Sequence, residues 1–293
     1  MTGGRDTVRS TVVLAGGQIS YLDFRPPDPR QTVLLLHGGG VDSAELSWGE
    51  VAPRLAAAGH RVIAPDHPGH GRSPLPNWPV TQQRLLDYVA QFIDVLNLDR
   101  YVIGGLSLGG GLAIGHVLAA PERVTAVMLL DSYGLMPRLA GVRQPLSWVM
   151  QRSGVLDAAT GWMATNRAAL AWSMKSLIRD PARRTPELVA EILAAARQPG
   201  FTAFEQWQRD QILWNRLHTD YTPRLASIRC PTLIIHGEQD TGVPVARARA
   251  AAALIPDARL KVVAGAGHWV QRDAPDVVVG AMTDFLDRVS RGS

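Results

Sequence analysis

The chain has 293 residues, of which 46% are hydrophobic and 19% are charged, a composition typical of a soluble globular protein with a large core. Its formal net charge is +4, and no basic run is interleaved with aromatic residues, so we expect neither nucleic acid nor a membrane as a partner. Cys230 is the only cysteine, which excludes an internal disulfide and a cysteine-rich metal site.

The amino-terminal segment has no apolar core after its arginines, and no apolar run approaches the roughly 20 residues needed to cross a bilayer. These two features favour a cytoplasmic protein. We expect a monomer or a homodimer.

The chain begins with a predicted β-hairpin. Residues 11–14 and 19–24 have strand-like patterns on either side of the Gly16-Gly17 turn. After a proline-rich loop, Thr32–Leu36 is a continuous apolar run, which indicates a strand covered on both faces.

A glycine-rich loop, His37-Gly38-Gly39-Gly40, follows this buried strand directly. Glycines there let backbone amides approach a ligand, so Gly38 is a candidate substrate contact and the Gly39 amide a candidate oxyanion donor. The alternative is a merely flexible loop. His37 is expected to brace this loop rather than to exchange protons.

The next unit is a helix over residues 50–58, a strand over Arg61–Pro65 and a polar turn over residues 66–73. The turn contains two histidines, but no third ligand keeps a useful spacing, so no metal site is expected. Residues 83–96 have the apolar spacing of an amphipathic helix.

Residues 101–111, YVIGGLSLGGG, predict a strand, a tight turn and a helix in immediate succession. Gly105 to Gly109 fits the G-x-S-x-G nucleophile elbow, in which glycines avoid a collision with neighbouring backbone and the serine hydroxyl projects from the sheet edge. Ser107 is then the candidate nucleophile. The amide of Leu108, at the first turn of the helix, is a candidate oxyanion donor. An ordinary serine in a glycine-rich turn is the alternative.

Another buried strand, Val124–Leu130, follows, and after it the alternation of strands and helices stops. Residues 134–222 contain helical patterns, no strand-like run and five of the chain's eight tryptophans. This predicts a helical insertion with an aromatic inner face. Trp148 and Trp207 are the candidate substrate contacts, while other tryptophans would only hold the helices together.

Alternation of strands and helices resumes with strands at residues 231–235 and 259–263 and helices at 245–254 and 275–289. Such alternation implies a mostly parallel, eight-stranded sheet flanked by helices and interrupted once after the sixth strand. The expected domains are a core of residues 1–133 and 223–293 and a helical cap of residues 134–222.

Ser107, Asp240 and His268 each come directly after a predicted strand. Loops at the carboxyl ends of parallel strands share one edge, so these three side chains should meet. A histidine can remove the serine proton, and a carboxylate can fix the histidine tautomer. Asp131 and Glu238 are competing candidates for the carboxylate.

The motifs HGGG, DHPGHGRS, GLSLGG, GEQD and GAGHW occur in an order that resembles the α/β-hydrolase superfamily, in a form with a helical cap. The resemblance covers essentially the whole chain and implies Ser107 as nucleophile, His268 as general base and Asp240 as its orienter. Gly39 and Leu108 would supply the oxyanion amides. Trp269 would either line the pocket or pack behind the histidine. No cofactor and no metal are expected.

The sequence therefore favours hydrolysis of an apolar ester, lactone or similar carbonyl substrate through an acyl-enzyme. A cofactor-free perhydrolase and a non-catalytic small-molecule receptor are alternatives with the same fold.

A further alternative is cleavage of a carbon-carbon bond, because HGGG and residues 268–271 are similar to hydrolases of aromatic ring-fission products. Leu106 and the pair Val41-Asp42 depart from the pattern of those enzymes. A cationic cap residue for the substrate carboxylate is also expected there. Arg209 and Arg216 are the candidates.

Overall fold

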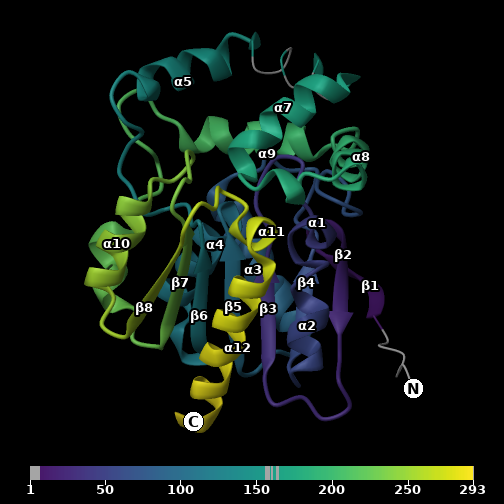
Figure 1. Cartoon of the computed structure of the whole chain (residues 1–293), viewed down its shortest axis with the longest axis vertical. Coiled ribbons are helices and arrows are strands. Elements are labelled where there is room, and N and C mark those ends of the chain that lie inside the picture. Colours follow the sequence, from purple (N-terminus) through teal and green to yellow (C-terminus); the bar gives the residue numbers. More distant parts are fainter. Residues whose placement is uncertain (1–6, 156–158, 160, 163–164, 293) are drawn as a thin grey trace.

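An eight-stranded sheet runs through the centre of the computed structural model, in the order β1-β2-β4-β3-β5-β6-β7-β8 (Figure 1). The first two pairings, β1 with β2 and β2 with β4, are antiparallel, and all the others are parallel. The strands are β1 (Thr7–Leu14), β2 (Gly17–Phe24), β3 (Thr32–Leu36), β4 (Arg61–Pro65), β5 (Tyr101–Leu106), β6 (Val124–Leu130), β7 (Thr232–Gly237) and β8 (Ala258–Val263). The predicted fold class is confirmed.

The structure describes residues 7–155, 159, 161–162 and 165–292. Parts of the two predicted domains therefore lie outside the described residues: residues 1–6 and 293 of the core, and residues 156–158, 160 and 163–164 of the cap. The hairpin is longer than expected, because β1 pairs with β2 from Thr7 opposite Phe24 through to Leu14 opposite Gly17. The polar residues at the start of β1 hid this extension, since β1 is an edge strand and needs no apolar pattern.

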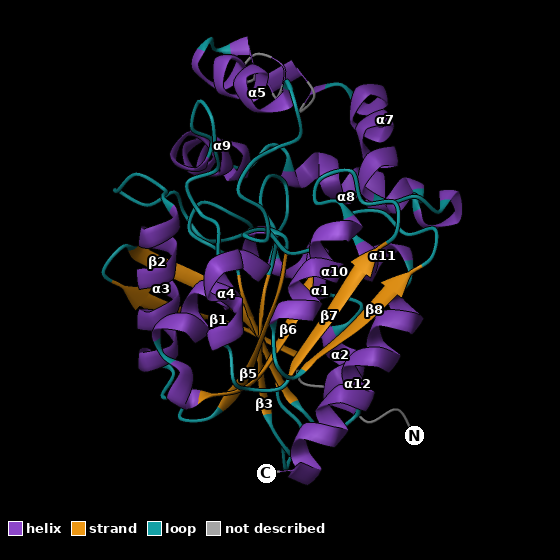
Figure 2. Ribbon diagram, turned by 90° about the vertical axis from the view of Figure 1, so that its left-hand side faces the viewer, coloured by secondary structure: helices purple, strands orange, loops and turns teal. Residues whose placement is uncertain are grey.

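Helices cover both faces of the sheet (Figure 2). One apolar core contains residues of α3 (Gln82–Val95), α4 (Leu108–Ala119) and α10 (Val245–Leu254). A second core contains residues of α1 (Ala44–Trp48), α2 (Ala52–Ala57), α11 (Val270–Asp273) and α12 (Pro275–Gly292). Helix α1 was not expected, although Ser43 caps it by accepting a hydrogen bond from the Leu46 amide.

Among the described residues, several helices form an upper helical layer above the carboxyl ends of the parallel strands (Figure 1). They are α5 (Arg143–Arg152), α7 (Arg167–Leu177), α8 (Pro186–Ala195) and α9 (Gly200–Gln211). All four lie between β6 and β7 in the chain. The two ends of this stretch meet where the Tyr221 amide donates to the Gly134 carbonyl at 2.9 Å, as an insertion into the sheet would require. The cap boundaries themselves stay a prediction.

Among the described residues, no helix is both long enough and apolar enough to pass through a membrane.

Candidate active site

The predicted nucleophile, Ser107, lies in a strained turn between β5 and α4. Its φ of 50° is unusual for a residue with a side chain, and its amide donates to the Leu130 carbonyl at 2.9 Å. The flanking glycines are needed sterically: a Cβ on Gly105 would lie 2.2 Å from the Gly109 backbone, and one on Gly109 would lie 2.3 Å from the Leu36 carbonyl oxygen. The backbone thus presents the Ser107 side chain at the carboxyl edge of the sheet.

The predicted base and its predicted orienter are in direct contact. His268 Nδ1 lies 2.8 Å from Asp240 Oδ2. The other oxygen of Asp240 accepts hydrogen bonds from the amides of Gly242 at 2.7 Å and Val243 at 3.1 Å. Burial alone would favour the neutral acid, but hydrogen bonds from His236 and His268 outweigh it and hold the pKa of Asp240 well below its ordinary value. Asp240 is therefore an ionised acceptor for His268 at neutral pH.

Ser107 and His268 both line two cavities. The smaller, of about 230 Å³, is lined by both residues, the glycine loop and Trp269. The larger, of about 440 Å³, is lined by both residues and Trp207. Ser107 is thus open to ligands on two sides.

Phe204 of α9 lines both cavities, and sequence reasoning missed it. A Cβ on Gly39 would lie 2.2 Å from Phe204 Cδ2, so a side chain at this position would force the Phe204 ring away from the loop. The Phe204 ring stacks on Trp207 with centroids 5.5 Å apart. A phenylalanine in an amphipathic helix carries no sequence signal that distinguishes a cavity wall from ordinary packing.

Asp42, a fully buried carboxylate, anchors the glycine loop through hydrogen bonds. Its Oδ2 accepts from the Gly38 amide and the Ser47 hydroxyl, both at 2.6 Å, and its Oδ1 accepts from the Ser43 amide at 2.8 Å. Burial raises the pKa of Asp42 to about 6, against the opposing effect of these hydrogen bonds. Asp42 orients the loop that contains the predicted oxyanion donor Gly39. The second predicted donor, Leu108, is the first residue of α4 and is buried.

His37 braces the loop as expected from the sequence. Its Nδ1 lies 2.7 Å from the Gly38 carbonyl oxygen, and its Nε2 accepts the backbone N–H of His67 at 2.9 Å.

The predicted substrate contacts are not all at the cavities. Gly38, Trp269 and Trp207 are among the lining residues. Trp148 is not among the lining residues of either cavity; it packs edge-to-face against Trp214, with centroids 5.6 Å apart, beneath the Arg152 guanidinium.

The competing carboxylates of the sequence analysis lie elsewhere. Glu238 is exposed and accepts from the Gly265 amide at 3.1 Å. Asp131 is fully buried behind Asp240, where it accepts from the amides of Gly237 at 2.8 Å and Val270 at 3.3 Å. Of the three candidates, Asp240 is the one that bonds His268.

Among the described residues, one group of three side chains could offer close ligand atoms to a metal: Asp131, His236 and Asp240. Both oxygens of Asp240 already accept hydrogen bonds, from backbone amides and from His268. We therefore assign no metal to this group.

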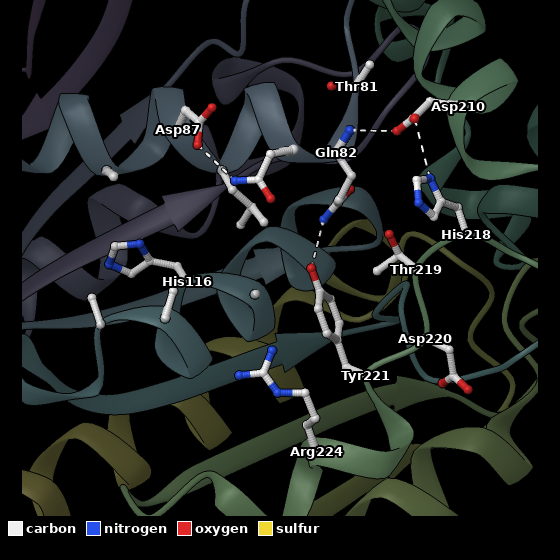
Figure 3. A pocket seen from close by; sticks show the side chains of 16 residues that line it. Thr81, Gln82, Asp87, His116, Asp210, His218, Thr219, Asp220, Tyr221 and Arg224 are labelled. Carbon is white, nitrogen blue, oxygen red and sulfur yellow. Dashed lines mark hydrogen bonds and ion pairs between the residues drawn. The ribbon is translucent and has the colours of Figure 1, made fainter.

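A third hollow, of about 600 Å³, lies away from Ser107 between α3, α4 and residues 218–224 (Figure 3). Its polar side chains are largely bonded to one another: the Gln82 amide group donates to Tyr221 Oη at 3.3 Å, and the Gln82 backbone N–H donates to Asp210 at 2.9 Å. Gln82 also accepts from Trp207 Nε1 at 2.8 Å. Gln82 therefore links this hollow to Trp207 in the wall of the larger cavity.

Comparisons with known proteins agree with this fold. The family model for the alpha/beta hydrolase fold matches residues 31–275. The chain is 30% identical over 285 residues to 2-hydroxy-6-oxo-6-(2'-aminophenyl)hexa-2,4-dienoic acid hydrolase of Metapseudomonas resinovorans, covering 94% of this chain and 90% of the relative. It is 29% identical over 271 residues to 2-hydroxy-6-oxo-6-phenylhexa-2,4-dienoate hydrolase of Burkholderia cepacia, covering 87% of each.

A solved structure, that of a mutant of the meta-cleavage product hydrolase CumD from Pseudomonas fluorescens IP01 complexed with acetates, superposes with a TM-score of 0.79 at 27% identity. The superposition covers 95% of this chain and 97% of that one.

Proposed function

Because this chain belongs to the α/β-hydrolase family, we propose that it hydrolyses a carbon-carbon bond next to a carbonyl group, with Ser107 as nucleophile, His268 as base and Asp240 as orienter. One observation carries the proposal: His268, which bonds Asp240 at 2.8 Å, lines the same two cavities as Ser107. The choice of bond follows the names of the relatives, which favour this alternative over the ester hydrolysis expected from the sequence.

The arrangement supports a two-step reaction. Ser107 Oγ attacks the carbonyl carbon while its proton passes to His268, and the amides of Gly39 and Leu108 stabilise the oxyanion. As the bond breaks, its electron pair goes to the leaving carbon, which takes the proton from His268. A water then attacks the acyl-enzyme, gives its proton to His268 and releases an acid, and Ser107 regains its proton.

A carbon leaving group needs a stabilised electron pair. Conjugation with a second carbonyl, as in the vinylogous diketones made by aromatic ring fission, supplies that stabilisation. The apolar walls of the two cavities suit an aryl or alkyl substituent on the attacked carbonyl.

Hydrolysis of an ester or lactone is the second candidate, and one observation favours it. The described residues lining both cavities include no arginine or lysine to bind a substrate carboxylate. Arg209 and Arg216 are exposed, and neither is among the lining residues. A neutral substrate would avoid placing an unpaired charge in an apolar cavity.

A matched substrate panel separates the two candidates. It contains a yellow ring-fission dienoate, the methyl ester of its carboxylate, and a chromogenic p-nitrophenyl ester, each tested with wild type and Ser107→Ala. Bleaching of either dienoate by wild type but not by Ser107→Ala would support carbon-carbon cleavage, and release of p-nitrophenol alone would support the second candidate. Saturable binding without turnover, together with equal labelling of both proteins by a fluorophosphonate, would overturn both.

A further inference from the structure

A second imidazole lies behind the predicted catalytic pair. His236 Nε2 is 3.4 Å from Asp240 Oδ2, the same oxygen that bonds His268, and His236 Nδ1 is 3.7 Å from Asp131 Oδ1. The side chains of Asp131, His236 and Asp240 have no solvent exposure. Asp131, His236, Asp240 and His268 thus form a continuous row that alternates carboxylate and imidazole, and only the His268 end of this row is partly exposed.

The contacts of the two His236 ring nitrogens indicate where a proton lies in this row. His236 Nε2 donates its hydrogen to the Val243 carbonyl oxygen at 2.8 Å. His236 Nδ1 has no hydrogen-bond partner and faces the Asp131 carboxylate. An unprotonated Nδ1 would point a lone pair at a negative oxygen, so a proton must lie between these two groups, on one or the other.

That proton decides the charge of Asp240. The groups that face His236 are Asp131 at the end of β6 and Asp240 after β7, and His268, just before α11, faces Asp240 from the other side. Without a proton near Asp131, two buried carboxylates would compete for one, and Asp240 would be neutral for part of the time.

We propose that Asp131 and His236 hold one shared proton, and that this pair is a positioning element that keeps Asp240 ionised and directed at His268. The inference rests on the proposed triad and goes beyond it. Neither residue touches the substrate cavities: neither is among their lining residues.

The pKa directions agree with this geometry. Burial opposes a charge on His236, but its hydrogen bond with Asp240 and the charge of Asp131 raise its pKa. Burial and the neighbouring Asp240 raise the pKa of Asp131 well above its ordinary value. Both shifts favour retention of a proton in the pair at neutral pH.

The test measures the rate constant for labelling by a fluorophosphonate, which reports activation of Ser107 without knowledge of the substrate. His236→Gln keeps a donor for the Val243 carbonyl but cannot carry the proton. We expect it to label at least about 10-fold more slowly than wild type at pH 7, a loss of about 1.4 kcal/mol in transition-state stabilisation. Its labelling should recover at alkaline pH, because the proton shared by Asp131 and Asp240 then dissociates. The acid limb of the plot of labelling rate against pH therefore moves to higher pH.

The decisive variant is the double substitution Asp131→Asn/His236→Gln. With the second carboxylate removed, Asp240 is the only acid left in the row and ionises again. The double variant should therefore label faster than His236→Gln, and the acid limb of its pH profile should return toward wild type. A purely structural role for His236 predicts the opposite, since a second buried substitution would add to the damage.

His60→Gln is the matched control for loss of a buried histidine. His60 is fully buried, has no hydrogen-bond partner on either ring nitrogen and lies outside the row. It should label like wild type. Thermal unfolding of every variant shows that it is folded. The inference would be overturned if His236→Gln labelled at the wild-type rate, or if the double variant labelled no faster than His236→Gln. Failure of the wild type to label would instead refute the proposed function.

Discussion

Histidines form two groups near Ser107, one beside the glycine loop and one beside Asp240, and the two groups have opposite surroundings. On the side of the glycine loop, the rings of His37 and His67 are 4.0 Å apart and those of His37 and His70 are 5.3 Å apart. Burial, reinforced by neighbouring histidines, lowers the pKa of His37 well below its ordinary value and that of His67 to about 3, while burial lowers that of His70 to about 4. Because His37 Nε2 accepts the His67 amide, protonation there would break a bond.

On the other side, each imidazole contacts a carboxylate. His236 lies between Asp131 and Asp240, and His268 bonds Asp240. His236 is as fully buried as His37, so burial alone does not decide whether an imidazole can hold a proton. A carboxylate partner does, and this difference separates the structural histidines from the one that we propose as a base.

The largest expected effect is on Asp240. Asp240→Asn removes the charge and the acceptor that fix the His268 tautomer, so we expect kcat/KM to fall by ~10⁴-fold. The measurement is turnover of the most active compound of the substrate panel. Glu238→Gln is the control, because Glu238 is the exposed carboxylate of the same loop. Equal losses in the two variants would remove Asp240 from its proposed role.

The next effect concerns Asp42, the carboxylate that bonds the glycine loop. Asp42→Asn replaces one of the oxygens that bond Gly38, Ser43 and Ser47, so the loop should loosen and kcat should fall by up to ~10²-fold, the scale for loss of one oxyanion donor. Ser47→Ala removes one donor to Asp42 and should cost less. Wild-type turnover by Asp42→Asn would show that the loop needs no such anchor.

Asp42 also gives a stability signature with a definite sign. Its pKa of about 6 in the folded chain exceeds the ordinary value of 3.8, so the folded state binds the proton more tightly and gains stability as pH falls from 6 to 4. The ionised form at pH 7 costs on the order of 3 kcal/mol relative to the protonated form. Asp42→Asn should abolish this contribution in urea unfolding between pH 4 and 7, and an unchanged pH dependence would contradict it.

A smaller effect is expected at Phe204, which lines both cavities and which we expect to separate them. Phe204→Ala should join them, so selectivity should shift by about 10-fold toward bulkier acyl groups, the scale of a few methylene contacts. The measurement is the ratio of kcat/KM for p-nitrophenyl esters of a branched and a short acid. Phe201→Ala is the matched control, because Phe201 lines the smaller cavity and not the larger one. Equal shifts in both variants would deny Phe204 its separating role.

The residues that sequence reasoning found and missed differ in a physical way. Ser107, Asp240 and His268 follow strands, and the common edge of parallel strands brings them together whatever lies between. Phe204 and the neighbours of Asp131 depend on how helices and loops pack in three dimensions, which no local pattern encodes. Trp148 is a further example, because the tryptophan content indicated an aromatic layer but not which rings line the cavity.

The smallest effect is expected at His70, in the group of histidines beside the glycine loop. Its pKa of about 4 in the folded chain lies below the ordinary value of 6.5, so the unfolded chain binds the proton more tightly and stability is lost as pH falls from 6.5 toward 4. His70→Gln removes this proton uptake, and the slope of unfolding free energy against pH should decrease by about 1.4 kcal/mol per pH unit in that window. Urea titrations at intervals between pH 4.5 and 7 measure the slope. An unchanged slope would mean that His70 takes up its proton within the folded chain, and the two sides of Ser107 would then differ less than their surroundings indicate.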